Sequence, residues 1–145
     1  MGSIYIYILK EVLSTGWSNE DLDGKVLKQG SAYLLDKIVN KLPKEHRNKF
    51  PYLQRLEYCI DYYDGEKTFL LKNEVKSLKT EFDTLLKIMK RKEFLNNVDA
   101  DEFLLYLSKE KFPTPTKEEI LKDLLGIKEL IDYAVKNESN IYIDR

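Results

Sequence analysis

The stretch SIYIYIL at residues 3–9 decides the fold. β-Branched and aromatic residues dominate it, which is typical of a β-strand. Because Tyr alternates with Ile, both faces of this strand are apolar. The strand is therefore either central in a sheet or presents a face of Tyr side chains to a partner. A second short strand, NIYID, is expected at residues 140–144. We expect these two terminal strands to pair in one sheet.

Residues 57–71 carry the strongest local pattern in the chain, that of a β-hairpin. YCIDYY at residues 58–63 is followed by Asp64-Gly65 and then by EKTFL at residues 66–70. Asp-Gly supplies the two positive φ angles of a type I′ turn, which favours a two-residue hairpin connection.

The predicted hairpin is acidic and rich in tyrosine, in a chain whose overall charge is nearly balanced. Tyr side chains are enriched at protein interfaces, because the ring packs while the hydroxyl stays in water. Tyr62 and Tyr63 point to opposite faces, so one can pack in the core while the other serves as an anchor. The proposed partner-binding residues are Asp61, Tyr62, Tyr63, Asp64 and Glu66. If the hairpin is only structural, the loop at residues 17–23 is the next place to look.

Helical patterns separate the strands. Four helices are expected, at residues 34–42 after Ser31 as N-cap, at 71–89, at 98–109, and from a capping box at Thr116 to near Asn137. Residues 14–30 read as a loop, and residues 51–56 are ambiguous. The predicted fold class is α+β, in which terminal strands and a hairpin form a small, mainly antiparallel sheet packed by about four helices. Residues 1–145 are expected to form a single domain.

Composition and charge narrow the function classes. The chain is 43% hydrophobic and 34% charged, which is typical of a folded domain. With 24 Lys and Arg against 25 Asp and Glu, it lacks the basic excess of nucleic-acid binders, so no direct nucleic-acid partner is expected. The apolar run at residues 4–9 lacks the basic flank of a secretory signal, and no run approaches a membrane span. The lone Cys59 suits a reducing cytosol, so we expect a cytoplasmic protein.

Residues that could carry catalysis are sparse. His46 is the single histidine and lies in a charged stretch, so a Ser-His or Cys-His nucleophile pair would have to use it. One Cys and one His exclude the common zinc sets. The segment at residues 21–24 echoes part of a calcium loop, and residues 99–102 contain three acids, but both read better as a polar turn and a helix start. No catalytic, metal-binding or cofactor residue is therefore assigned. An enzyme that uses a metal held by Asp or Glu, such as Asp61 and Asp64, stays open as an alternative.

Two segments resemble immunity proteins of bacterial polymorphic toxin and contact-dependent growth inhibition systems. FPYLQRLEYCIDYYDGEKTFLLKNEVKSLKTEFDTL at residues 50–85 is similar to that family in its P-x-L-x-R lead, acidic turn and following helix. LKDLLGIKELIDYAVKNESNIYIDR at residues 121–145 is similar to the family's closing helix and strand. The two segments cover under half of the chain.

The resemblance implies a non-enzymatic, cytosolic inhibitor. Its partner would be a cognate toxin domain, which it would neutralise by blocking the active site or an essential surface. Many such toxins are nucleases with basic clefts, which an acidic and aromatic surface would fit. The alternative is another stoichiometric protein-binding inhibitor or adaptor, for instance one encoded by a phage. A toxin gene immediately upstream would favour immunity.

Overall fold

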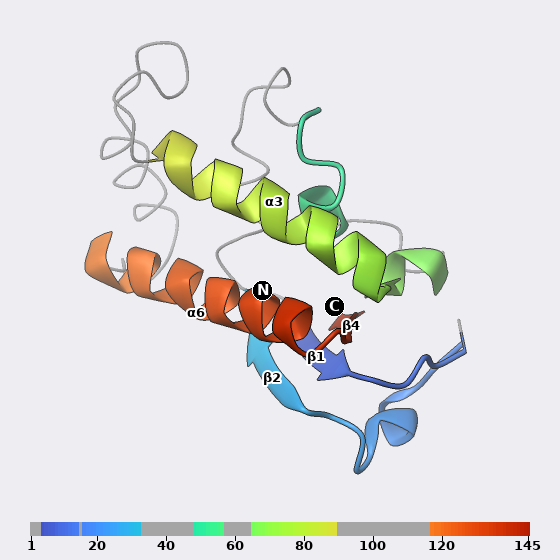
Figure 1. Ribbon diagram of the computed structural model, residues 1–145. Helices are drawn as coiled ribbons and strands as arrows, with labels where there is room; N and C mark the ends of the chain where they lie inside the picture. The colour runs from blue at the N-terminus through green and yellow to red at the C-terminus, as the bar shows by residue number, and fades with distance from the viewer. Residues whose placement is uncertain (1–3, 15, 33–47, 57–64, 90–116) are drawn as a thin grey trace.

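The computed structural model describes residues 4–14, 16–32, 48–56, 65–89 and 117–145. These residues form a four-stranded antiparallel sheet with two α-helices packed on one face (Figure 1). The fold class is therefore α+β, as the sequence predicts.

The sheet joins the two ends of the sequence. Its strands are β1 (Tyr5–Leu9), β2 (Lys28–Ser31), β3 (Phe69–Leu70) and β4 (Asn140–Asp144), in the order β2-β1-β4-β3. β1 and β4 pair antiparallel along their whole length, from Tyr5 opposite Asp144 to Leu9 opposite Asn140. The predicted pairing of the terminal strands is confirmed, and β1 is a central strand between β2 and β4.

The two helices, α3 (Lys72–Met89) and α6 (Lys117–Lys136), pack against each other and against the same face of the sheet. Each carries the apolar stripe that the sequence predicts. The buried residues are Val75, Leu78, Phe82 and Leu85 on α3, and Leu124, Ile127, Leu130, Ile131 and Ala134 on α6. They meet the Ile side chains of β1 and β4. Burial of one such side chain contributes roughly 1.5–3 kcal/mol, so this core dominates the stability of the fold.

The expected number of about four helices is not matched by the described part of the chain. There, α3 and α6 are the only α-helices, and three short 3-10 helices accompany them. The 3-10 helices are η1 (Asn19–Leu22), η2 (Leu53–Leu56) and η3 (Gly65–Thr68). The other two expected helices, at residues 34–42 and 98–109, lie outside the described residues.

Strand β2 corrects two predictions, a loop at residues 14–30 and a helix N-cap at Ser31. Ser31 instead pairs with Tyr5 in the sheet. The sequence KQGS has little β propensity, so the strand depends on tertiary packing. A Cβ atom at Gly30 would lie 2.6 Å from Cδ1 of Leu130, so the missing side chain lets α6 approach β2 closely. Beside it, the Lys28 ammonium lies 5.2 Å from the centroid of the Tyr133 ring on α6.

The predicted hairpin is described only in its second arm, because residues 57–64 lie outside the described residues. The sequence predicts an extended second arm over residues 66–70. This prediction is wrong for residues 66–68, which belong to η3, and is confirmed for β3. The physical reason is that long-range contacts outweigh the local pattern. Arg145 donates a hydrogen bond to the Lys67 carbonyl at 2.6 Å, and β3 pairs with β4.

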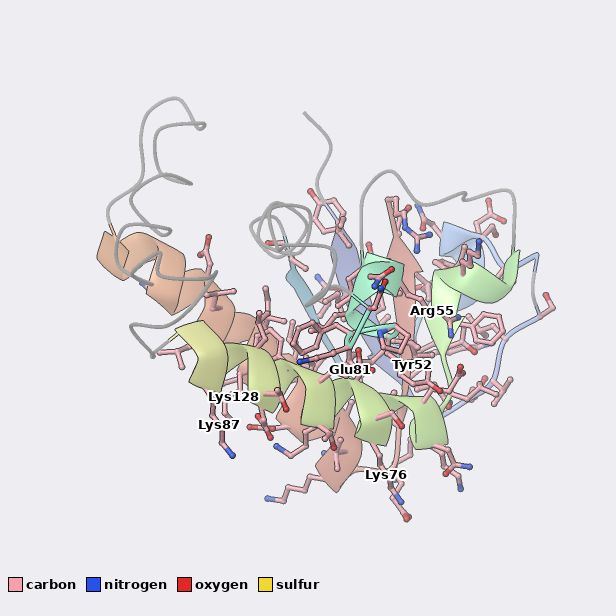
Figure 2. All side chains as sticks on the ribbon, turned by 90° about the horizontal axis from the view of Figure 1, so that it is seen from above. Tyr52, Arg55, Lys76, Glu81, Lys87 and Lys128 are labelled. Carbon is pink, nitrogen blue, oxygen red and sulfur yellow. The ribbon has the colours of Figure 1, made fainter. Side chains whose placement is uncertain are left out.

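Residues 51–56, which the sequence leaves ambiguous, contain η2, and a carboxylate from α3 caps it. Glu81 accepts hydrogen bonds from the backbone N–H groups of Tyr52 and Leu53 at 3.0 and 3.2 Å. Figure 2 labels Glu81 on α3 next to Tyr52. Burial raises the pKa of Glu81 above its ordinary value of 4.5, although the two backbone hydrogen bonds act in the opposite direction.

Replacing Glu81 should separate the roles of its charge and its hydrogen bonds. Glu81→Ala should destabilise the protein by about 1–3 kcal/mol, because the buried N–H of Leu53 and that of Tyr52 lose their acceptor. Glu81→Gln keeps an acceptor oxygen. Because the pKa of Glu81 is raised in the folded state, ionising it costs stability as the pH rises from 4.5 through the folded pKa. The free energy of unfolding of Glu81→Gln should therefore rise relative to the wild type over that range.

Urea unfolding of the wild type and both variants at several pH values measures these differences. Lys76→Ala, at an exposed position on the same helix, is the control and should change stability by less than about 0.5 kcal/mol. Equal losses for the Ala and Gln variants at every pH would show that the acceptor oxygen is not what stabilises η2.

A buried asparagine joins three parts of the fold. Asn140, at the start of β4, is 4% exposed. Its Nδ2 lies 3.1–3.3 Å from the carbonyl oxygens of Leu9, Lys10 and Glu11, where the chain leaves β1. Its Oδ1 accepts a hydrogen bond of 3.1 Å from the backbone N–H of Lys72, the first residue of α3. One side chain therefore provides hydrogen-bond partners for backbone carbonyl groups after β1 and for a backbone N–H group at the start of α3.

Candidate functional site

The outer face of the sheet, opposite the helices, is covered by the segment at residues 10–27. Figure 1 shows this blue segment on the side of the strands away from α3 and α6. It packs on the alternate side chains of β1 and β4 and forms a second, smaller apolar cluster. The cluster consists of Leu9, Leu22 and Tyr142, with Tyr7, Leu13, Trp17, Val26 and Phe69 half-buried around them.

Tyr142 on β4 anchors this segment. The ring of Tyr142 is fully buried, and its hydroxyl oxygen accepts a hydrogen bond of 2.6 Å from the backbone N–H of Leu13. Trp17 packs edge-on against it, with ring centroids 5.5 Å apart. The Trp17 indole N–H also donates to the Thr68 hydroxyl at 3.1 Å. Because Thr68 belongs to η3, the segment at residues 10–27 is fastened to the stretch that follows residues 57–64.

The tip of this segment is an ordered, acidic turn. The Asp21 carboxylate accepts a hydrogen bond of 2.7 Å from the backbone N–H of Ser18 at the start of η1. Leu22 is buried beneath the turn, so the polar residues around it are held at the surface. Gly24 adopts a φ of 71°, which favours glycine, and turns the chain back toward β2.

Between this tip and the sheet lies an open hollow with a volume of about 910 Å³. Its lining is mixed, with apolar side chains, an aromatic ring, two carboxylates and two amides. The residues are Tyr7, Asn19, Glu20, Leu22, Asp23, Gly24, Val26 and Gln29. They come from β1, β2 and the segment between them, so pairing of the two strands builds the hollow.

The charge around the hollow is negative. Within the described ranges, Glu20 and Asp23 at its rim make no ion pair, and neither does Asp144 on β4. Burial raises the pKa of the Tyr7 hydroxyl, and the nearby Asp144 carboxylate raises it further. A second anion at Tyr7 is therefore disfavoured, whereas a cation placed there would be attracted by the uncompensated carboxylates.

The helix side of the molecule has a different charge pattern. Lys79 on α3 bonds to both Asp83 and Asp132, at 3.1 and 2.7 Å, which links α3 to α6. Hydrogen bonds to these carboxylates raise the pKa of Lys79. Lys76 and Lys87 are exposed on α3 and point away from the sheet (Figure 2). The described surface is thus acidic at the tip near the hollow and carries outward-pointing lysines on α3.

The structure tests little of the site predicted from sequence. Asp61, Tyr62, Tyr63 and Asp64 lie outside the described residues, and of Glu66 only the backbone, in η3, is described. His46, Cys59 and the acids at residues 99–102 also lie outside the described part. The proposed partner-binding residues therefore stay a prediction.

Arg145 nevertheless joins the two described stretches that lie on either side of residues 57–64. The Arg145 guanidinium donates to the carbonyl oxygens of Arg55 and Lys67, at 2.5 and 2.6 Å. Burial, with the neighbouring Arg55 charge, lowers the pKa of Arg145 to about 10. Arg55 in turn donates to the Phe69 carbonyl and bonds to Glu74 at 2.8 Å. The chain thus leaves and re-enters the described fold at one place, beside η2 and η3.

The hollow itself was not predicted from sequence. The sequence indicates the stretch at residues 17–23 only as a second candidate for partner binding, because its polar and glycine residues are typical of an ordinary loop. The signal that could have found it is the Tyr face of β1, which leaves an aromatic surface for some segment to cover. Which segment covers it, and how much, depends on β2, a strand that the sequence does not predict.

Metal sites and membrane-spanning helices were searched for in the described residues. Among the residues that the structure describes, no three His, Cys, Asp or Glu side chains lie close enough together to hold a metal ion. In the same residues, no helix is both long and apolar enough to cross a membrane.

Comparison of this chain with protein-family models, with curated proteins and with solved structures found no match.

Proposed function

We propose that this protein is a cytosolic immunity protein that binds a cognate bacterial toxin domain and neutralises it without enzymatic activity. The resemblance of residues 50–85 and 121–145 to such proteins motivates the proposal. The structural observation that supports it best is the acidic and aromatic outer face of the sheet, where carboxylates without ion pairs surround an open hollow. Carboxylates and aromatic rings exposed in this way are the groups that recognise a basic protein surface.

The physical logic concerns both rate and affinity. An acidic surface steers a basic partner during diffusional encounter, and aromatic residues supply most of the affinity once they are desolvated. A nuclease domain, whose substrate cleft must attract phosphates, has the complementary charge. Because Tyr142, Trp17 and Thr68 fasten the acidic segment to the sheet, little ordering entropy is lost on binding.

The proposed interface extends from the hollow toward the predicted hairpin. The hydrogen bond from Trp17 to Thr68 places the segment at residues 10–27 against η3, which directly follows residues 57–64. Asp61, Tyr62, Tyr63, Asp64 and Glu66 would then continue the same acidic surface. This arrangement supports a single contact area made of two stretches that are distant in the sequence.

Co-expression with the product of the gene immediately upstream tests the function. Cells that express the upstream protein alone should stop growing, and cells that also express this protein should grow normally. The two purified proteins should form a complex of fixed stoichiometry in size-exclusion chromatography and calorimetry. Toxicity that persists despite equal expression, with no complex, would contradict the immunity function. Turnover of the upstream protein or its substrate by this protein alone would instead indicate an enzyme.

A further inference from the structure

The hollow between β1, β2 and the acidic tip is the feature of the described surface most suited to a ligand. Its volume of about 910 Å³ falls within the range of small-molecule sites and is ample for one long side chain. It is open to solvent, so an element that protrudes from a partner can enter it without unfolding this protein. Leu22 and Val26 give it an apolar lining, and Tyr7 contributes an aromatic ring.

The charges at the hollow select the ligand. Glu20 and Asp23 lie at its rim, Asp144 interacts with Tyr7, and within the described residues none of the three makes an ion pair. The other two acids of the segment are already used, because Asp21 bonds to Ser18 and Glu11 pairs with Lys25 at 3.3 Å. The two carboxylates that line the hollow therefore carry negative charge that no ion pair neutralises. A cation gains from this field, and an anion is repelled.

Because apolar side chains and carboxylates line the same hollow, it favours an organic cation that is attached to a chain of methylene groups. Methylene groups can pack on Leu22 and Val26, while the charged head reaches the carboxylates in water, as long basic side chains do elsewhere. A guanidinium can bond two oxygens of one carboxylate at once and also stack on an aromatic ring such as Tyr7. The amide oxygens of Asn19 and Gln29 add further acceptors.

We propose that this hollow is a socket for a basic side chain, arginine in preference to lysine, that projects from the toxin partner. The inference rests on the proposed function for the source of the arginine, and it identifies the part of the partner that is recognised. The socket would fix the register of the complex, since one inserted side chain positions the surfaces around it. The remaining acidic surface would supply steering.

The first test uses a probe that needs no knowledge of the partner. N-acetyl-arginine N-methylamide is titrated into the ¹⁵N-labelled protein, with the neutral citrulline analogue as the matched control. The arginine probe should shift the amide signals of Asn19, Gly24 and Gln29 in a saturable way, with a Kd in the millimolar range. The citrulline analogue should leave them unchanged. The lysine analogue should bind in the same place but more weakly, because it lacks the planar fork.

A charge-neutralising variant then separates the socket from general attraction. Glu20→Gln with Asp23→Asn should weaken arginine binding at least about fivefold. Asp123→Asn with Glu129→Gln removes the same charge from exposed positions of α6 and should leave binding unchanged. Shifts that are absent up to tens of millimolar, that are spread over the surface, or that are equally weakened by both double variants would overturn the proposal. Binding of calcium at the same residues in place of arginine would overturn it as well.

The same two double variants distinguish this proposal from the function on which it rests. If the upstream toxin is neutralised by the wild type and equally well by Glu20→Gln with Asp23→Asn, the protein is an inhibitor but the hollow is not its socket. If the probe binds in the hollow while the upstream protein is neither bound nor neutralised, the socket stands and the immunity function fails. Fluorescence of Trp17, the single tryptophan of the chain, provides an independent readout, because Trp17 belongs to the same apolar cluster as Tyr7 and Leu22 of the hollow.

Discussion

Removing residues 140–145 should abolish the folded state of this protein. β4 lies between β1 and β3, so its loss exposes one edge of β1 and leaves β3 without a strand partner. Ile141, Tyr142 and Ile143 are almost completely buried, and three such side chains contribute roughly 5–9 kcal/mol. Domains are typically stable by only about 5–15 kcal/mol. The truncated chain should therefore show no cooperative transition in thermal melting and no dispersed amide signals in NMR.

Adding the missing strand back provides the control. A synthetic peptide with the sequence of residues 138–145, supplied in excess, should restore part of the cooperative transition, since it can pair with β1 from a separate chain. A peptide in which Ile141 and Ile143 are replaced by Thr should not. A truncated protein that melts at the wild-type temperature would show that β4 is not part of the cooperative fold.

The second large effect is expected at Asn140. Asn140→Asp removes both donor hydrogens and places a carboxylate against the carbonyl oxygens of Leu9, Lys10 and Glu11. A buried charge that faces these oxygens costs about 3–5 kcal/mol, although the Lys72 N–H still donates to it, so this variant should be strongly destabilised at neutral pH. Because burial favours the protonated acid, its folded-state pKa would be raised, and part of the lost stability should return as the pH falls. Asn140→Ala should be destabilised as well, without that pH dependence.

Urea unfolding at neutral and acidic pH measures this difference. Asn73→Asp makes the same chemical change at an exposed position in the first turn of α3, where a negative charge is acceptable, and serves as the control. It should change the free energy of unfolding by less than about 0.5 kcal/mol. Equal stability of the two Asp variants would mean that the Asn140 contacts are not maintained in solution.

The parts of the fold that were predicted from sequence are those whose signal is periodic and buried. The alternating apolar residues of β1 and β4 predict strands, and steps of three and four such as Val75, Leu78 and Phe82 predict α3 and likewise α6. These predictions are confirmed because the side chains that form the patterns are also the ones that form the hydrophobic core. Their pairing followed from both segments being short, terminal strands that need partners.

The missed parts depend on contacts that no local pattern records. Lys28–Ser31 forms a strand because Gly30 admits Leu130 of α6, which lies far away in the sequence. Residues 66–68 form η3 instead of an extended arm because β4 and Arg145 hold that stretch in place. The hollow could not be predicted from sequence because β2, which was missed, supplies one wall and the tip at residues 19–24 supplies another. A site formed by segments that lack a clear sequence pattern can be recognised only from the assembled sheet.

The central position of β4 also has a consequence during protein synthesis. β1 pairs with a strand that is made much later, and Leu9 and Asn140 are 131 residues apart. At about 5–20 residues per second, the ribosome needs roughly 7–26 s to bridge that interval. Throughout this time the nascent chain exposes the edge of β1 that β4 later covers, while β2 alone is available to pair with the other edge. A chain stalled before β4 would therefore present an apolar strand edge to chaperones, proteases and other nascent chains, so a stop codon placed before residue 140 should produce insoluble or rapidly degraded protein.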